Sequence, residues 1–253
     1  MSEDTPAATR ALSFGPAAAE YDRLRPRYPE PALRWALGDQ RLRVVDLGAG
    51  TGILSRALVA LGHEVLPVEP DQGMREQLAA VSPELTPLAG FAEQIPLPDG
   101  SVDAVMAGQA YHWFDPEPTH VEVARVLRPG GVFAPIWNQR DETVPWIGEL
   151  STMAHGEAAG DGMRELLGDR PSFGPSFDPV ARETFVHAIE HTVDTLVGLI
   201  ATRSYFLTAP PERQAEMAAE VRRLCAEHPE LAGRERFELP YRTLVYRGVR
   251  SAD

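Results

Sequence analysis

Three glycines at alternate positions, Gly48, Gly50 and Gly52, separate one short apolar run from a second apolar pattern. A glycine turn between a strand and a helix brings backbone N–H groups and the positive end of the helix close to a ligand. The dinucleotide-binding pattern G-x-G-x-x-G does not fit this spacing, because Ile53 follows Gly52. The triphosphate-binding loop needs a lysine, and all 24 basic residues of the chain are arginine. The turn therefore favours a ligand without phosphate groups.

Two acidic residues accompany this turn. Asp46 lies two residues before Gly48, and Glu69 ends the next apolar run. A carboxylate at the end of a second strand is placed to accept hydrogen bonds from both hydroxyls of a ribose. Asp46 would repel a phosphate but attract a cation, although it could also only orient the turn. Together the two acids favour S-adenosylmethionine, which has a positive sulfonium group and no phosphate.

Strands and helices that must position these residues alternate along the first half of the chain. Apolar runs predict buried strands, and helical spacing of apolar residues predicts helices between them. The predicted strands cover 44–47, 63–69, 85–90, 102–110 and 132–138. The predicted helices contain Leu54, Leu58 and Leu61; Met74, Leu78 and Val81; and residues 117–128. This alternation predicts a parallel sheet covered on both faces.

The two ends of the chain follow a different pattern. Two short helices broken by Pro26 and Pro29 are expected at the N-terminus. The second half predicts one short helix around Met163, a strand over 183–191, helices over 193–200 and 211–228, and a strand pair or one bent strand over 236–248. We expect a single domain with an N-terminal cap (1–40), a cofactor-binding core (41–138), a lid-like insertion (139–182) and a C-terminal part (183–253).

Composition excludes several classes of function. The formal net charge is −13, from 37 acidic and 24 basic residues, which disfavours a nucleic-acid partner. Cys225 is the single cysteine, so neither a disulfide nor a thiolate metal cluster is expected, and a packed thiol is favoured. His187 and His191 have no third ligand, so we expect no metal. The chain shows neither a signal peptide nor a membrane-spanning run, which predicts a cytoplasmic protein without a membrane partner.

Four stretches in order resemble the motifs of class I S-adenosylmethionine-dependent methyltransferases: VVDLGAGTG, PVEPDQGM, GFAEQIPLPDGSVDAVMAGQAYHWF and RVLRPGGVFAPIWN. AEYDRLRPRYP, AYHWFD and LPYRTLVYR are similar, more narrowly, to the trans-aconitate methyltransferase-like branch of small-molecule enzymes. The resemblance implies an α/β fold with a Rossmann-like, doubly wound, seven-stranded sheet whose last strand is antiparallel. It also implies an N-terminal helical cap and an insertion after the fifth strand. The expected reaction transfers a methyl group to a small molecule and leaves S-adenosylhomocysteine.

The resemblance also implies which residues form the site. The expected cofactor-binding residues are Tyr21, Arg25, Tyr28, Asp46, Gly48, Ala49, Gly50, Gly52, Glu69, Pro70, Met74, Phe91, Ala92, Glu93 and Gln109. Many relatives have Asp where this chain has Phe91, which exchanges a hydrogen bond to adenine for an aromatic contact. The expected substrate residues are Tyr21, Tyr111, His112, Trp113, Asn138 and Arg140, with His112 and Tyr111 as the catalytic pair.

Several alternatives stay open at this point. His112 can remove a proton from a hydroxyl or amine, or it can simply line the site. Arg25, Arg27 and Arg140 can clamp a substrate carboxylate, or they can be ordinary surface arginines. The methylated group can be a carboxylate, a hydroxyl, a nitrogen or an activated carbon. The competing functions are a nicotinamide-dependent oxidoreductase and a non-catalytic S-adenosylmethionine-binding protein. The chain can act as a monomer or as a homodimer.

Overall fold

A computed structural model of the chain describes residues 22–155 and 171–252. Six strands form one mixed sheet in this part of the chain, in the order β2-β1-β3-β4-β6-β5. The strands are β1 (Arg43–Leu47), β2 (Glu64–Val68), β3 (Val102–Gly108), β4 (Leu127–Arg140), β5 (Ala181–His191) and β6 (Phe237–Val249). The pairs among β2, β1, β3 and β4 are parallel, and β6 is antiparallel to both of its neighbours. The α/β fold and the antiparallel last strand are therefore confirmed.

The expected strand over 85–90, the third along the chain, is wrong in its extent, and the sheet has six strands within the described residues instead of seven. Leu88 makes only an isolated parallel bridge to Val68, next to β2. The Leu88 amide donates to the Pro67 carbonyl and the Glu69 amide donates to the Leu88 carbonyl, at 2.8 and 3.0 Å, so the pairing with this edge of the sheet is limited to a single residue. At the other end of the sheet, the alternative of one strand is confirmed, because β6 runs unbroken for 13 residues.

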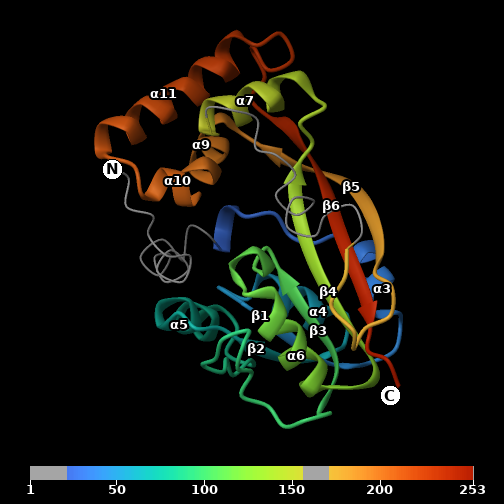
Figure 1. The fold of residues 1–253 in the computed structure, drawn as a ribbon. Helices are drawn as coiled ribbons and strands as arrows, with labels where there is room; N and C mark the ends of the chain where they lie inside the picture. The colour runs from blue at the N-terminus through green and yellow to red at the C-terminus, as the bar shows by residue number, and fades with distance from the viewer. Residues whose placement is uncertain (1–21, 156–170, 253) are drawn as a thin grey trace.

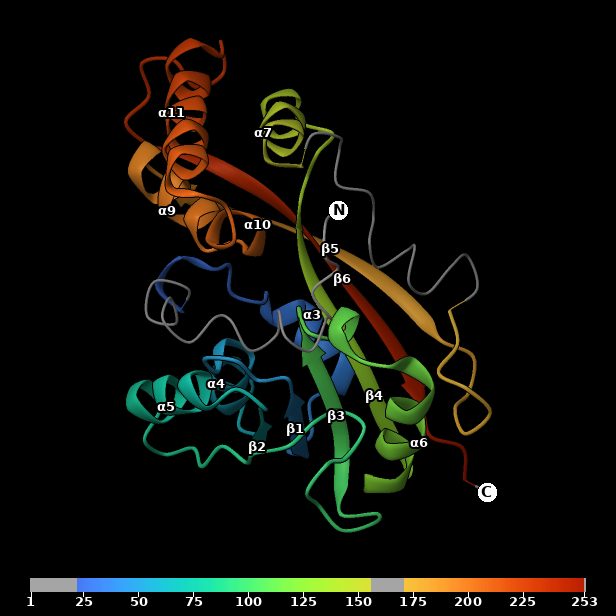
Figure 2. The same ribbon diagram turned by 60° about the vertical axis from the view of Figure 1, so that its left-hand side comes forward.

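Helices cover both faces of the sheet, as Figures 1 and 2 show. The helices of the first half are α3 (Glu30–Leu37), α4 (Ile53–Ala60), α5 (Gln72–Val81) and α6 (Pro116–Val126). Apolar residues of α3, α4 and α5 pack with Val44, Met106 and Ile136 in one core cluster. Apolar residues of α6 pack with Val45 and Phe133 in another. Because neighbouring residues of a strand point to opposite faces, these two clusters lie on the two sides of the sheet.

A helical lobe surrounds the far end of the long strands β4, β5 and β6 (Figure 1). It consists of α7 (Pro145–His155), α9 (Val193–Ala201), α10 (Ser204–Leu207) and α11 (Pro211–Glu227). Its core combines α7, α9 and α11 with the start of β6, and Cys225 is buried there, as expected. The sequence pattern missed α7, and the helix expected around Met163 lies outside the described residues. Within the described ranges, no helix combines the length and the apolar character that a membrane crossing needs.

Candidate active site

The glycine turn follows β1 directly and is held against β2. The amides of Gly48 and Ala49 donate to the carbonyl of Val68, at 2.8 and 3.1 Å. Gly48, Gly50 and Gly52 have φ angles of 69°, 54° and 83°, which L side chains rarely adopt. A Cβ at Gly48 would lie 2.6 Å from that of Ala110, whereas a Cβ at Gly50 would have no atom within 4 Å. The turn is therefore packed at Gly48 and open at Gly50.

Asp46 is buried beneath this turn, with 1% of its surface exposed. The Ser55 hydroxyl donates to its Oδ2 at 2.6 Å, and Oδ1 is buried with no partner among the described residues. Burial raises the pKa of Asp46 to about 7, against the effect of the Ser55 hydrogen bonds. A buried carboxylate oxygen without a donor is costly, so the site calls for a donor or a cation beside Asp46.

Glu69 follows β2 and reaches back to the same turn. Its Oε2 accepts from the Gly50 amide and its Oε1 from the Asp71 amide, both at 2.9 Å. The side chain is buried, and burial raises its pKa, against these two backbone hydrogen bonds. An ionised carboxylate has about four acceptor positions, so Glu69 keeps capacity for two further donors such as ribose hydroxyls.

Two residues predicted from separate motifs, Pro70 and Phe91, line one surface depression. Phe91 is 54% exposed, which is unusual for a large apolar residue. Ala92 and Met74 are buried. Glu93 is engaged through one oxygen, since its Oε1 accepts from the Asp115 amide at 2.9 Å, at the start of α6.

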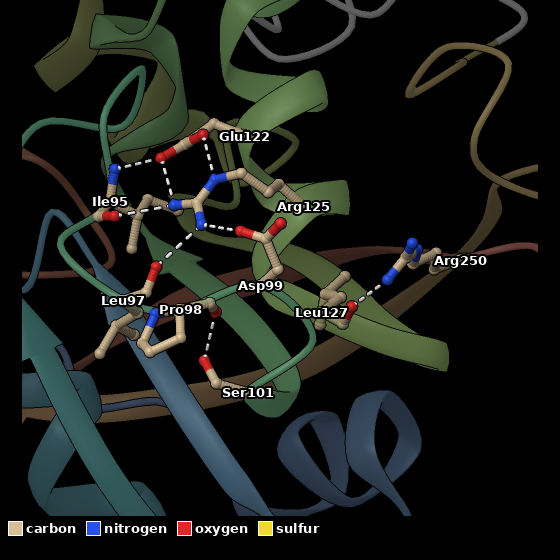
Figure 3. A network of polar contacts seen from close by, with 9 residues as sticks. All are labelled: Ile95, Leu97, Pro98, Asp99, Ser101, Glu122, Arg125, Leu127 and Arg250. Carbon is tan, nitrogen blue, oxygen red and sulfur yellow. Dashed lines mark hydrogen bonds and ion pairs between the residues drawn. The ribbon is translucent and has the colours of Figure 1, made fainter.

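A polar network fixes the loop that carries Phe91 (Figure 3). Arg125 donates to the carbonyls of Ile95 and Leu97, at 3.0 and 2.9 Å. Glu122 accepts from the Ile95 amide at 2.7 Å, and it also pairs with Arg125. The paired charges hold the pKa of Glu122 below its usual range. The loop is thus attached to α6 through its backbone.

The segment before α3 closes over the glycine turn. Asp22 accepts from the Thr51 hydroxyl at 3.0 Å and forms an ion pair with Arg56. Sequence reasoning missed Asp22, although it lies next to the predicted Tyr21, which is outside the described residues. The Tyr28 ring is buried, and its hydroxyl lies 2.6 Å from where a Cβ of Gly108 would stand. The described part of this segment, from Asp22 to Tyr28, therefore contacts both β3 and the glycine turn.

Gln109 and Asn138 join the ends of β3 and β4. Gln109 has a φ of 57°, a left-handed conformation that is uncommon outside glycine. Its side chain accepts from the Asn138 amide at 2.9 Å and donates to the Asn138 carbonyl at 3.2 Å. The Asn138 side chain donates to the carbonyls of Pro26 and Arg27 and accepts from Thr243 at 2.6 Å. Both side chains are therefore engaged in holding the cap and the sheet.

The expectation that Tyr111 is catalytic is corrected by its position. The residues from Tyr111 to Trp113 form a 3-10 turn, and Tyr111 points from it into the core with 1% of its surface exposed. Its hydroxyl is 2.7 Å from Nε2 of His120, and its ring packs on Phe133. Burial raises its pKa well above the usual range. Tyr111 supports the turn and does not face the site.

His112 points the other way and is solvent-exposed. Its ring lies against Trp113, with the ring centroids 4.6 Å apart. Although exposed, it is surrounded by enough protein that desolvation, together with the charge of Arg25, lowers its pKa to about 4. His112 is therefore neutral near pH 7 and can accept a hydrogen bond there.

The three candidate arginines separate into two groups. Arg27 is largely exposed and donates to the Asp22 carbonyl at 2.9 Å. Arg25 donates to Thr202, at the end of α9, at 3.0 and 3.1 Å. Arg140 ends β4, and burial lowers its pKa, as does the charge of Arg203. Arg25 and Arg140 lie on the side of the helical lobe, and Arg27 does not join them.

Known proteins similar to this chain are consistent with this geometry. A family model described as a methyltransferase domain matches residues 45–134. An uncharacterized methyltransferase of Mycobacterium tuberculosis is 43% identical over 94% of this chain and 96% of its own length. An uncharacterized methyltransferase-like protein of Schizosaccharomyces pombe is 30% identical over 92% and 94%. A solved structure from Anaeromyxobacter dehalogenans, assigned as a type II methyltransferase, superposes with a TM-score of 0.61, at 26% identity over 89% and 96%.

Proposed function

Since this chain belongs to the class I S-adenosylmethionine-dependent methyltransferases, we propose that it methylates a small molecule bound where β3 and β4 end. The observation that carries this proposal is the buried Asp46 oxygen without a partner, next to the open Gly50. A cationic ligand would satisfy that oxygen, whereas a phosphate would be repelled. The residues present thus fit a sulfonium nucleoside.

The chain's own residues divide the work of binding. Asp46 and the glycine turn would hold the positively charged end of the ligand, and Glu69 would accept hydrogen bonds from the ribose hydroxyls. Pro70 and Phe91 offer an apolar surface to the adenine ring, in place of a polar partner. When bound, S-adenosylmethionine supplies an electrophilic methyl group.

Methyl transfer requires mainly alignment and exclusion of water. The cap, held by Asp22 and Asn138, is placed to close the glycine turn against solvent. His112, which stays neutral, adds no positive charge beside the sulfonium group and can accept a hydrogen bond from a hydroxyl or amine of the acceptor. A carboxylate acceptor would need no base. The net charge of −13 favours a small acceptor over a nucleic acid.

Calorimetry of the purified protein with S-adenosylmethionine, S-adenosylhomocysteine and NADH tests the proposal. We expect both sulfur nucleosides to bind and NADH to give no heat. Binding of NADH alone would refute the proposal in favour of an oxidoreductase. Binding of S-adenosylmethionine without release of S-adenosylhomocysteine across a broad panel of acceptors would instead support a non-catalytic binding protein.

A further inference from the structure

Three neighbouring strands carry a row of polar side chains near the helical lobe. Arg140 of β4 lies opposite Tyr241 of β6, and Tyr241 lies opposite His187 of β5. Residues directly opposite in a sheet point to the same face, so the three side chains lie side by side. The His187 and Tyr241 rings stack, with centroids 5.5 Å apart and planes 19° apart.

Polar atoms of this row are buried but have no partner. Nη1 of Arg140 and the hydroxyl of Tyr241 make no hydrogen bond within the described part of the chain, and the same holds for Nε of Arg203, which follows α9. Buried polar groups in folded proteins are nearly always hydrogen-bonded. Arginine N–H groups only donate. Two buried arginine donors, beside a hydroxyl that can also donate, therefore indicate a missing acceptor.

The charges of this cluster lead to the same conclusion. Burial lowers the pKa of Arg140, and the charge of Arg203 lowers it further, against the smaller effects of two tyrosines and Glu142. Burial raises the pKa of Tyr241, against the charges of Arg203, Arg140 and Arg25. Like charges held together in a partly buried position are unfavourable without a counter-ion. An anion bound between Arg140 and Arg203 would remove the repulsion and satisfy the donors.

This cluster adjoins the proposed methyl-transfer site. Arg25 donates to Thr202, the neighbour of Arg203, and its charge also acts on His112. Arg140 lies two residues beyond Asn138 on β4, so their side chains share a face of the sheet. Figures 1 and 2 both show α9 and α10 near the end of β4. Ligands of open α/β sheets bind outside the carboxyl ends of the parallel strands.

We propose that Arg140, Arg203 and Tyr241 form a binding site for a carboxylate group of the methyl acceptor. This inference rests on the proposed function for the identity of the bound molecule as acceptor. Arginine donors that hold a carboxylate draw negative charge from its oxygens and so weaken them as nucleophiles toward a methyl group. The bound carboxylate is therefore an anchor, and the methylated atom is a different group of the same molecule. The acceptor is an organic acid that keeps its carboxylate through the reaction.

The proposal is tested by saturating the intact protein with S-adenosylhomocysteine and then titrating it with benzoate in a calorimeter. Benzamide serves as the uncharged analogue and inorganic phosphate as a second anion. We expect benzoate to bind more tightly than benzamide and phosphate, with an affinity that falls as salt is added. Arg140→Gln and Arg203→Gln should each weaken benzoate binding about tenfold or more. Arg234→Gln, which changes an exposed arginine, is the matched control and should leave it unchanged.

Two further measurements separate this proposal from its alternatives. Without ligand, Arg140→Gln and Arg203→Gln should unfold at the same temperature as the parent protein or at a higher one, because each substitution removes a repelled charge. A lower unfolding temperature for both variants would indicate a structural role of the arginines and overturn the proposal. Equal binding of benzoate and benzamide, or benzoate binding that survives both substitutions, would also overturn it. Retained S-adenosylhomocysteine binding in those cases would leave the proposed function intact. If the parent protein does not bind S-adenosylhomocysteine at all, that result refutes the proposed function alone.

Discussion

The affinity for S-adenosylmethionine should depend on pH through Asp46. Burial raises the pKa of this carboxyl group to about 7 in the ligand-free protein. A positively charged ligand beside Oδ1 needs the ionised form, so binding must first remove the proton from any protonated Asp46. The affinity should therefore fall as the pH drops below 7, and binding should release protons in that range.

The size of this effect follows from the ionised fraction. With a pKa of about 7, roughly one carboxyl group in eleven is ionised at a pH one unit lower. The affinity there should be about tenfold below its plateau at higher pH, which corresponds to about 1.4 kcal/mol. Asp46 acts on folding in the opposite sense, because its pKa is raised from 3.8. Its contribution to stability is greatest below that value and is lost as the pH rises through about 7.

Calorimetry between about pH 6 and pH 8, in buffers that differ in ionisation enthalpy, measures both the affinity and the protons released. Asp46→Asn should bind S-adenosylmethionine more weakly and should lose most of the pH dependence of the affinity. This variant therefore distinguishes a pH dependence that comes from Asp46 from one that comes from the neighbouring Glu69. Ser55→Ala removes a hydrogen bond that lowers the Asp46 pKa, so it should move the midpoint to higher pH. A parent protein whose affinity is constant over this range would show that Asp46 does not face the charge of the ligand.

Three other changes give separate expectations. Gly50→Ala should cost only about 1–2 kcal/mol of stability, from its positive φ, yet weaken cofactor binding about tenfold. Gly48→Ala should destabilise the fold by roughly 2–4 kcal/mol, because its Cβ meets Ala110. If the two variants lose the same stability in thermal unfolding and the same affinity in calorimetry, the open site at Gly50 is contradicted. Glu69→Ala should reduce cofactor affinity by roughly 1–3 kcal/mol, the cost of unpaired hydroxyls, and an unchanged dissociation constant would exclude the ribose contact. His112→Ala should lower turnover while cofactor binding is retained, and normal turnover of this variant would make His112 a lining residue. Because the pKa of His112 is about 4, the pH–rate profile of the parent protein should show no inflection from this residue near neutrality.

Local patterns predicted the elements that surround the glycine turn. The alternation of apolar runs and helical spacing produces β1, α4, β2 and α5 within one or two residues, because each of these elements buries a face that its own sequence makes apolar. The glycine spacing predicted a turn between a strand and a helix, and all three glycines of that turn have positive φ angles. Local chemistry is sufficient where a residue acts through the conformation of its own backbone.

Other features depend on contacts that the sequence does not display. Tyr111 and His112 are adjacent in one short turn, and only tertiary packing decides that the first enters the core and the second faces solvent. The link between Asp22 and Arg56 joins residues 34 positions apart. The helix α7 was missed because the stretch 139–182 is rich in residues typical of loops, whereas its helix is stabilised by burying Trp146 in the lobe.

The two halves of the candidate site also differ in how far apart their residues lie in the sequence. The cofactor half is built from consecutive strand ends, so that Asp46, Gly50 and Glu69 fall within 24 residues of one another. The proposed acceptor half depends on strand register, because Arg140 meets Tyr241 across more than a hundred residues of chain. A change of register or of lobe helices would alter the acceptor site and leave the glycine turn unaltered. The fold can therefore keep one methyl donor while different chains on it bind different acceptors, and the identity of the acceptor must be sought at the lobe.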